Sequence, residues 1–394
     1  MKITSVDIFA LHMRNNSFTQ PVVCRISTDE GIYGYGESAI SYGKGSSAAL
    51  NMIKDLAPLV IGMDPLDNEV IWDKLYKTTF WGQNGGPIVF AGIAALDIAL
   101  WDIKGKYFNV PVYKLLGGKK QQKLRTYASQ LQFGWGPEMC PWTPQYKTSE
   151  YAKIAKKAVD EGYDCIKIDF FTFKEDGGMY TSEDSTRLLP PWHLSVLEDR
   201  IAAVREAIGK NVDIIIENHS NTDAMSAIQI ANMAEKYKIF YFEEPNTPTP
   251  KMTKFIHDNI KIPIASGERI YTRWQYAQYF ENNSLQVIQP DIGNCGGITE
   301  VKKICDMAYV YDVSVQAHVC SSPISVAASL QLEAAIPNFL IHEHHINNID
   351  PATIELCVNN YQPNKGYFDI PDLPGLGNEL SDYALKTSDI ITVK

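Results

Sequence analysis

The sequence has 394 residues, of which 45% are apolar and 21% charged, an ordinary balance for a globular protein. Its net charge is −10 and its pI is near 5.4, which disfavours nonspecific binding to nucleic acid or to an anionic membrane, because both attract basic surfaces. The length indicates two domains, or a large barrel with an attached module.

The first part of the chain, residues 1–124, is predicted to be a small α+β capping domain. Residues 2–11 and 21–37 alternate like strands, and Asp29-Glu30-Gly31 is typical of a hairpin turn within the second stretch. Residues 46–62 and 91–108 have the apolar spacing of helices. Asp97 interrupts the second of these, so we do not expect it to cross a membrane.

Residues 125–354 follow a different pattern, in which short apolar runs alternate with amphipathic helices. Eight such βα units imply a parallel sheet closed into a modified TIM-type (β/α) barrel. The runs lie at 124–129, 164–170, 213–219, 238–245, 263–268, 285–292, 314–318 and 338–344. A long irregular segment, 170–194, interrupts the second unit, and loops of that length are usually functional or disordered. The remaining residues, 355–394, are expected to pack back on the capping domain and complete it.

The cysteines and the N-terminus favour a cytoplasmic protein. Seven cysteines are scattered without a Cys-x-x-Cys pair, so reduced thiols are expected rather than a disulfide framework. Asp7 lies where a secretory signal needs its apolar run.

A polar side chain stands at the carboxyl end of each late apolar run, at intervals of 23 to 27 residues. This interval is about one βα unit, and successive strand ends form a ring at the face where barrel active sites lie. The sequence therefore predicts that distant polar groups converge at one site. These residues are Glu217, Glu243, Glu268, Asp291, His318 and Glu343.

Three of these residues, Glu217, Glu243 and Glu268, come from successive strands and form an all-oxygen cluster. Neighbouring carboxylates repel one another unless a cation balances them, and a hard cation such as Mg²⁺ suits such ligands. The alternative is that each glutamate caps a helix or pairs with a lysine or arginine, but that alternative does not account for three acids at barrel spacing.

Two histidines are candidates for proton transfer. His219 follows Glu217 by two residues, and on an extended strand the two side chains would share a face. Asp291 and His318 lie on adjacent strand ends, where the aspartate can hydrogen-bond the imidazole and raise its basicity. The alternative for either histidine is a structural role in the core.

Lys167 and Asp169 also share a face of the second strand. Lys167 is predicted to bind a substrate carboxylate or to act as a second base, unless it faces the surface. Asp169 is a candidate substrate-binding residue. Glu343, if protonated, can donate a hydrogen bond to an oxyanion opposite the metal.

These motifs resemble the enolase superfamily, specifically its mandelate-racemase-like acid-sugar dehydratases, over essentially the whole chain. They include Phe-Glu-Glu-Pro (242–245), Ala-Ser-Gly-Glu-Arg (265–269), Gly-Gly-Ile-Thr-Glu (296–300) and the run 316–323. The resemblance implies that the three glutamates hold Mg²⁺, that Asp291 and His318 form the base dyad, and that Glu343 stabilises an enediolate.

Within this superfamily the chain is most similar in motifs to galactonate dehydratases, which also carry a histidine two residues after a metal-binding acid. Two features depart from that pattern. The first ligand is Glu217 where the family often has Asp. The 170–194 segment resembles an insertion of mannonate dehydratases, which implies catalytic parts for Tyr180 and Lys167.

The expected reaction is removal of water from a sugar acid such as galactonate, gluconate or mannonate, with His318 as base and His219 as acid. A racemase or epimerase, or a catalytically silent sugar-acid binder, remains an alternative. Segments 14–20 and 81–87 are predicted to close the site, with Arg14, Trp81 and Arg269 as candidate substrate-binding residues. The resemblance also implies a homo-oligomer.

Overall fold

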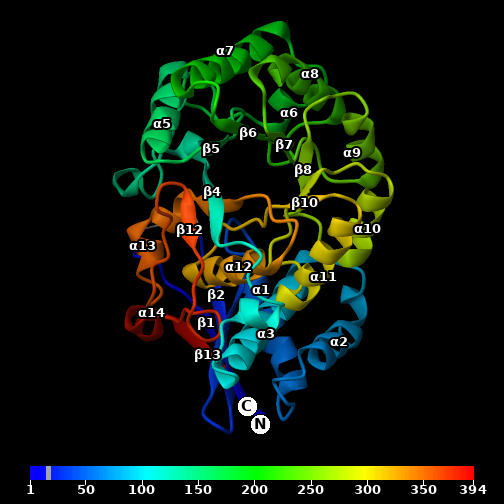
Figure 1. The fold of residues 1–394 in the computed structure, drawn as a ribbon, viewed down its shortest axis with the longest axis vertical. Helices are drawn as coiled ribbons and strands as arrows, with labels where there is room; N and C mark the ends of the chain where they lie inside the picture. Colours follow the sequence, from blue (N-terminus) through cyan, green and yellow to red (C-terminus); the bar gives the residue numbers. More distant parts are fainter. Residues whose placement is uncertain (15–18) are drawn as a thin grey trace.

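The computed structural model describes residues 1–14 and 19–394, and its N-terminal part is built on an antiparallel sheet (Figure 1). Its strands follow the order β13-β1-β2-β3, so the last strand of the chain pairs with the first. Their bounds are β1 Ile3–Ala10, β2 Val22–Thr28, β3 Tyr33–Ser38 and β13 Asp389–Val393. The expected hairpin joins β2 to β3.

Three helices pack beside this sheet: α1 Ser46–Val60, α2 Asn68–Thr78 and α3 Pro87–Tyr107. The sequence pattern missed α2. Helix α3 is buried on nearly all sides because it lies between β3 and helix α11 (Gly297–Val310) of the following part. Gly36 permits this close packing, since a Cβ atom there would lie 1.9 Å from the backbone oxygen of Ala95.

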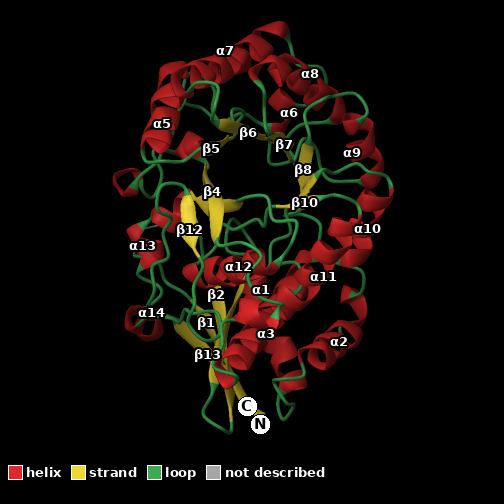
Figure 2. Cartoon of the chain, viewed as in Figure 1, coloured by secondary structure: helices red, strands yellow, loops and turns green. Residues whose placement is uncertain are grey.

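The rest of the chain forms a curved parallel sheet ringed by helices (Figure 2). The strands follow the path β10-β9-β8-β7-β6-β5-β4-β11, with β12 antiparallel to β4. Val315 of β10 also forms a parallel bridge to Phe339, which precedes β11. The bounds are β4 Lys123–Ser129, β5 Cys165–Ile168, β6 Asp213–Glu217, β7 Tyr241–Glu243, β8 Ile264–Ser266, β9 Val287–Ile288, β10 Ser314–Val315, β11 His342–His345 and β12 Tyr367–Asp369.

Helices cover the outside of this sheet, as the alternation of apolar runs and helical patterns predicts. The longer ones, besides α11, are α5 Thr148–Asp160, α7 Pro191–Ile208, α8 Ala224–Ala234, α9 Pro250–His257, α10 Arg273–Glu281 and α12 Pro323–Ala335. Short helices are α4 Val112–Leu115, α6 Ser182–Ser185, α13 Pro351–Ile354 and α14 Asp382–Thr387. The 3₁₀ turns are η1 Phe80–Gly82, η2 Leu131–Phe133, η3 Pro137–Met139, η4 Glu235–Tyr237 and η5 Ile346–Ile349.

Two buried carboxylates of the N-terminal part accept hydrogen bonds from the first turns of helices α12 and α11, which pack around the parallel sheet. Glu37, near the end of β3, accepts hydrogen bonds from the backbone N–H and the hydroxyl groups of both Ser322 and Ser325, at the start of α12. Asp97 of α3 accepts from the N–H and hydroxyl of Thr299 at the start of α11. Helix N-termini favour negative charge, so these acids fix two helices that follow strands of the site.

These features confirm the predicted fold class, an α/β protein with an antiparallel cap and a barrel-type parallel sheet. The division of the chain near residues 124 and 354 stays a prediction. The C-terminal tail pairs with both parts, through β13 with β1 and through β12 with β4. Within the described residues no helix is both long and apolar enough to traverse a bilayer.

Candidate active site

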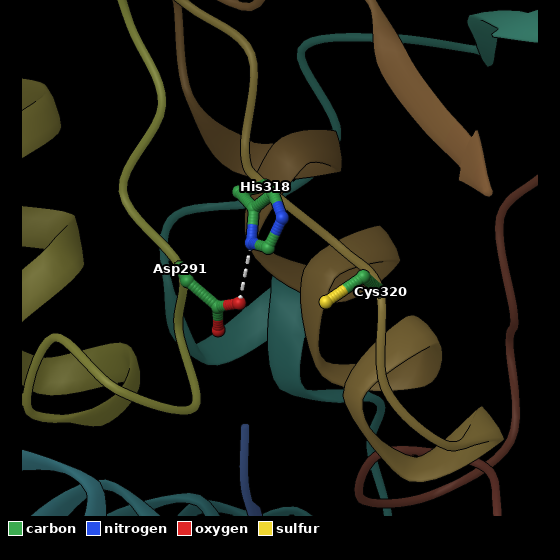
Figure 3. A group of neighbouring side chains, drawn as sticks. All are labelled: Asp291, His318 and Cys320. Carbon is green, nitrogen blue, oxygen red and sulfur yellow. Dashed lines mark hydrogen bonds and ion pairs between the residues drawn. The ribbon is translucent and has the colours of Figure 1, made fainter. Parts of the chain in front are cut away.

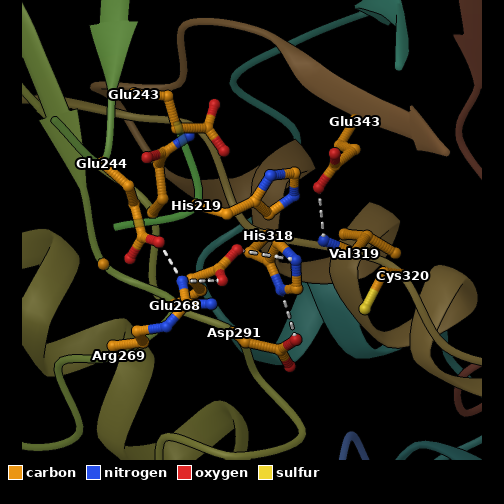
Figure 4. Close-up of polar contacts among 12 residues, drawn as sticks. His219, Glu243, Glu244, Glu268, Arg269, Asp291, His318, Val319, Cys320 and Glu343 are labelled. Atoms are coloured by element: carbon orange, nitrogen blue, oxygen red, sulfur yellow. Dashed lines mark hydrogen bonds and ion pairs between the residues drawn. The ribbon is translucent and has the colours of Figure 1, made fainter. Parts of the chain in front are cut away.

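Three glutamates converge at the carboxyl ends of neighbouring strands. Glu217 ends β6, Glu243 ends β7 and Glu268 follows β8 by two residues. One carboxylate oxygen from each lies within 4.8 Å of the others. Figure 4 shows Glu243 and Glu268 pointing into the same space as the two candidate histidines. The three glutamates that the barrel spacing predicts to converge thus lie together in the structure.

Lys167 lies inside this cluster instead of facing a substrate. Its side chain is 1% exposed, and its ammonium nitrogen lies 2.7 Å from Glu243 Oε1, 2.9 Å from Glu343 Oε1 and 3.3 Å from Glu217 Oε2. Burial lowers the pKa of Lys167, but these carboxylates outweigh it and raise the pKa well above its ordinary value. These contacts favour the protonated lysine, and its predicted use as a second base stays a prediction.

Glu343 accepts hydrogen bonds on both of its oxygens. Oε1 accepts from the Ser129 hydroxyl at 2.7 Å, and Oε2 accepts from the backbone N–H of Val319 at 2.9 Å. Burial raises the pKa of Glu343, but Lys167 and His318 more than offset this and hold it well below its usual value. In this arrangement both oxygens of Glu343 act as acceptors, and the predicted donation to an oxyanion stays a prediction.

His219 reaches the cluster by a different backbone route from the one predicted. Strand β6 ends at Glu217, and His219 and Ser220 adopt left-handed conformations with φ of 46° and 58°. Residues other than glycine rarely adopt positive φ angles, and the residues that do so concentrate at functional sites. The turn still brings His219 Nε2 to 3.1 Å from Glu217 Oε1. The expected proximity of the two side chains holds, but the extended-strand argument for it was wrong.

Asp169 orients His219 rather than standing free for a substrate. Its Oδ2 lies 2.6 Å from His219 Nδ1, and its Oδ1 accepts from the backbone N–H of Phe171. Burial lowers the pKa of His219, yet Glu217 and Asp169 raise it to about 9. The aspartate fixes the tautomer of the ring and leaves Nε2 toward the glutamates. The sequence did not predict this pairing, because His219 was placed on an extended strand beside Glu217 and not on a left-handed turn.

His318 and Asp291 form a second pair of the same kind. His318 Nδ1 lies 2.7 Å from Asp291 Oδ2 (Figure 3), and Nε2 lies 3.1 Å from Glu268 Oε2 (Figure 4). The other oxygen of Asp291 accepts from the backbone N–H of Gly293 at 2.8 Å, which fixes the carboxylate. Burial lowers the pKa of His318, but Cys320, Glu268 and Asp291 raise it well above its ordinary value. A cation on Glu268 would oppose that rise.

The carboxylate cluster fits a divalent cation. Glu243 Oε2 is buried and has no hydrogen-bond partner among the described residues, although burial of an unpaired carboxylate oxygen is costly. Burial, with Glu217 and Glu343 nearby, raises the pKa of Glu243 to about 8, even though Lys167 lowers it. A cation held by Glu217, Glu243 and Glu268 would satisfy this oxygen and relieve the repulsion.

Gln130 is a site residue that the sequence did not reveal. Its side-chain amide donates to Glu217 Oε2 at 2.6 Å and lies 3.2 Å from His219 Nε2. This contact gives the longer glutamate arm at position 217 a defined position. Gln130 follows β4, the first barrel strand, where Ser129 also contacts the site. The polar residues at the end of that strand are visible in the sequence, but neutral side chains do not form the pattern expected of metal ligands.

Other predicted contacts lie outside the cluster. Arg14 forms an ion pair with Glu355 and lies over the Tyr383 ring. Both partners belong to the C-terminal tail. Trp81 is 90% exposed on η1. Tyr180 stacks on His193, and none of its contacts within the described residues involves the carboxylate cluster. The catalytic role expected for Tyr180 stays a prediction.

Arg269 joins the cluster from outside. Its guanidinium contacts the carboxylates of Glu268 and Glu244, which leaves it beside a candidate metal ligand. Of the two predicted closing segments, 81–87 contacts α10 through the hydrogen bond from Gln275 to the Asn84 carbonyl. Residues 15–18 of the other segment lie outside the described residues.

Comparisons with known proteins match both parts of the chain. Residues 150–384 match the model of the enolase C-terminal domain-like family, and residues 6–117 match the N-terminal domain of mandelate racemase / muconate lactonizing enzyme. D-galactonate dehydratase of Pectobacterium atrosepticum is 31% identical over 97% of this chain and 93% of its own length.

Solved structures agree with these matches. A member of the enolase superfamily from Salmonella Typhimurium is 51% identical, covers all of both chains and superposes with a TM-score of 0.97. The 3,6-anhydro-D-galactonate cycloisomerase of Zobellia galactanivorans is 27% identical over 99% of this chain and 100% of its own, with a TM-score of 0.83. The chain therefore belongs to the enolase superfamily, in the family of mandelate racemase and muconate lactonizing enzyme.

Proposed function

We propose that the chain is an acid-sugar dehydratase that removes water from an aldonate and releases a 2-keto-3-deoxy sugar acid. One observation carries the proposal. Two imidazoles, each held by an aspartate at Nδ1, direct Nε2 toward opposite members of one carboxylate cluster. Dehydration needs two such groups, because one proton leaves C2 and another joins the departing hydroxyl.

The relatives support this class of reaction. Several proteins of about 30% identity that cover most of the chain are named D-galactonate dehydratase. We infer from this that galactonate, gluconate and mannonate are the first aldonates to test.

In this mechanism Glu217, Glu243 and Glu268 would hold Mg²⁺, whose charge stabilises the enediolate formed when C2 loses its proton. His318 Nε2 takes the C2 proton, while Asp291 retains the Nδ1 proton and keeps the ring oriented. His219 Nε2 donates a proton to the C3 hydroxyl as it leaves, and Asp169 orients that ring. Each positioned acid or base contributes roughly 10²–10⁴-fold to the rate.

Lys167 and Glu343 act on the cluster rather than on the bound acid. The ammonium of Lys167 offsets part of the charge of Glu217, Glu243 and Glu343, and the Ser129 hydroxyl donates a hydrogen bond to Glu343. Lys167 lowers the pKa of Glu243, which burial and the neighbouring glutamates raise, and so favours the ionised carboxylate that a cation needs.

The test is incubation of the purified protein with Mg²⁺ in D₂O and a panel of hexonates and pentonates. Keto-acid formation is expected with at least one of them. Deuterium exchange at C2 without keto acid would replace dehydration by racemisation or epimerisation. Two aspartate-held histidines also suit that second reaction, since either can take a proton. Neither product nor exchange with any acid would favour a silent binder.

Single substitutions separate the two histidines. His318→Asn is expected to abolish both C2 exchange and keto-acid formation, because the base is lost. His219→Asn is expected to abolish dehydration while C2 exchange continues. Unchanged dehydration in His219→Asn would show that another group protonates the leaving hydroxyl.

A further inference from the structure

A second cluster of potential ligands lies beside the glutamates and has a different chemistry. Asp291, His318 and Cys320 each offer one ligand atom, and these three atoms lie within 4.8 Å of one another. Figure 3 shows the Cys320 sulfur directed toward the space that the other two side chains border. The proposed mechanism uses Asp291 and His318, but it leaves the thiol without a task.

The ligand set selects a softer cation than the glutamates do. Glu217, Glu243 and Glu268 offer only carboxylate oxygens, which suit Mg²⁺. A thiolate, an imidazole and a carboxylate together suit Zn²⁺, which binds three protein ligands and keeps a fourth position open in many sites. Mg²⁺ has little affinity for sulfur, so the two clusters discriminate between the two kinds of ion.

Neighbouring contacts hold these ligands in place. Gly293 donates to the free oxygen of Asp291 at 2.8 Å. Two residues after Cys320, the N–H of Ser322 donates to Glu37 at 3.0 Å, and the Asn347 side chain donates to the Cys320 carbonyl. The loop that carries His318 and Cys320 is therefore anchored on both the cap and the barrel side. Ligands held in this way lose little freedom when a cation binds.

We propose that Asp291, His318 and Cys320 form a binding site for a soft divalent cation such as Zn²⁺, and that its occupation inhibits the enzyme. Cysteine binds metal as a thiolate and histidine through an unprotonated nitrogen, so the thiol proton and any proton on the ligating imidazole nitrogen pass to solvent as the metal bonds form. The inhibition rests on the proposed function, because the cation takes the imidazole that serves as the C2 base. The binding itself does not.

Cadmium tests the binding without any need for activity. Cd²⁺ bound to a thiolate gives an ultraviolet charge-transfer band that Cd²⁺ on carboxylates does not give. We expect the full-length protein in excess Mg²⁺ to develop this band and saturate at one Cd²⁺ per chain. Cys320→Ser is expected to lose the band, and His318→Asn to weaken Cd²⁺ binding by at least about 10-fold, since even outer-shell partners of a metal carry that much.

Cys140→Ser is the matched control. Cys140 and Cys320 are the cysteines classed as partly exposed, whereas Cys24, Cys165, Cys295, Cys305 and Cys357 are buried. The control is expected to keep the full band. A band that survives in Cys320→Ser, or that disappears in Cys140→Ser, would overturn the proposal. Thermal unfolding of both variants separates loss of a ligand from loss of the fold.

Inhibition is tested separately, with Zn²⁺ added to the Mg²⁺-saturated enzyme and its best aldonate. We expect Cys320→Ser to need at least about 10-fold more Zn²⁺ for half inhibition than the unmodified chain. Equal sensitivity would refute the inhibitory role even if the cadmium band is present. If no aldonate is dehydrated, the proposed function fails, while the cadmium result still decides whether the site exists.

Discussion

Replacing Lys167 with methionine tests whether the glutamate cluster depends on charge balance. Met keeps an unbranched apolar stem but removes an ammonium that lies 2.7 to 3.3 Å from three carboxylates. At an effective dielectric constant of about 20, each contact is worth roughly 5–6 kcal/mol before the cost of burying the charges is subtracted. Breaking a buried ion pair by removing one partner costs about 3–5 kcal/mol net.

We therefore expect Lys167→Met to lower the free energy of unfolding by about 4 kcal/mol in EDTA. Mg²⁺ at 100 times its dissociation constant stabilises a protein that binds it by about 2.7 kcal/mol. The variant is expected to gain more than the unmodified chain from the same Mg²⁺, because no ammonium competes with the ion for the carboxylates. Loss of stability should thus be largest without metal and partly recovered with it.

Urea unfolding followed by tryptophan fluorescence, with EDTA or Mg²⁺, measures both quantities. Lys77→Met is a suitable control, since Lys77 is exposed and pairs with Asp73 one helical turn away. That change is expected to cost no more than about 0.5 kcal/mol. Equal stability of Lys167→Met and the unmodified chain in EDTA, or an equal gain from Mg²⁺, would refute the reasoning.

Three further changes follow from contacts at the site. Asp169→Asn is expected to lower dehydration by about 10²-fold or more, because His219 loses its orienting charge, while C2 deuterium exchange continues; equal loss of exchange, followed by NMR, would contradict a role limited to His219. Gln130→Ala is expected to weaken Mg²⁺ binding by about 10- to 100-fold, measured by calorimetry, because Glu217 loses its hydrogen-bond donor; unchanged affinity would show that Gln130 does not position this ligand. Glu37→Ala is expected to lower the free energy of unfolding by about 3 kcal/mol, since four buried donors lose their acceptor, and urea midpoints that do not move would exclude this contribution.

The fold and the acidic part of the site were open to prediction because both repeat along the chain. Each βα unit returns the backbone to the same face, so Glu217, Glu243 and Glu268 were identified by position alone. The assigned roles of these residues stay predictions. Helix α2, Asn68–Thr78, was not predicted. Its apolar residues Ile71, Trp72 and Leu75 nevertheless have helical spacing and are buried on one side.

The Asp291–His318 pair was predicted from adjacent strand ends, but the partners of Lys167 and Asp169 were not. Lys167 lies in β5 and Asp169 directly follows this strand, yet Lys167 enters the glutamate cluster and Asp169 contacts His219. Which neighbour each side chain meets depends on strand order and on local turns. The left-handed backbone at His219 is a further case, because no glycine or asparagine at that position marks the turn.

The anchoring of α12 by Glu37 has a consequence for how this enzyme can diversify. The loop from His318 to Ser322 belongs to the barrel in sequence, but its position depends on hydrogen bonds to Glu37 of the cap. In a chimera that joins this barrel to the cap of a relative, we expect His318 to keep its position only if the incoming β3 supplies a carboxylate at position 37. Exchange of whole caps, a simple way to change what an enzyme admits, is therefore constrained by one buried acid whose hydrogen bonds go to the start of α12.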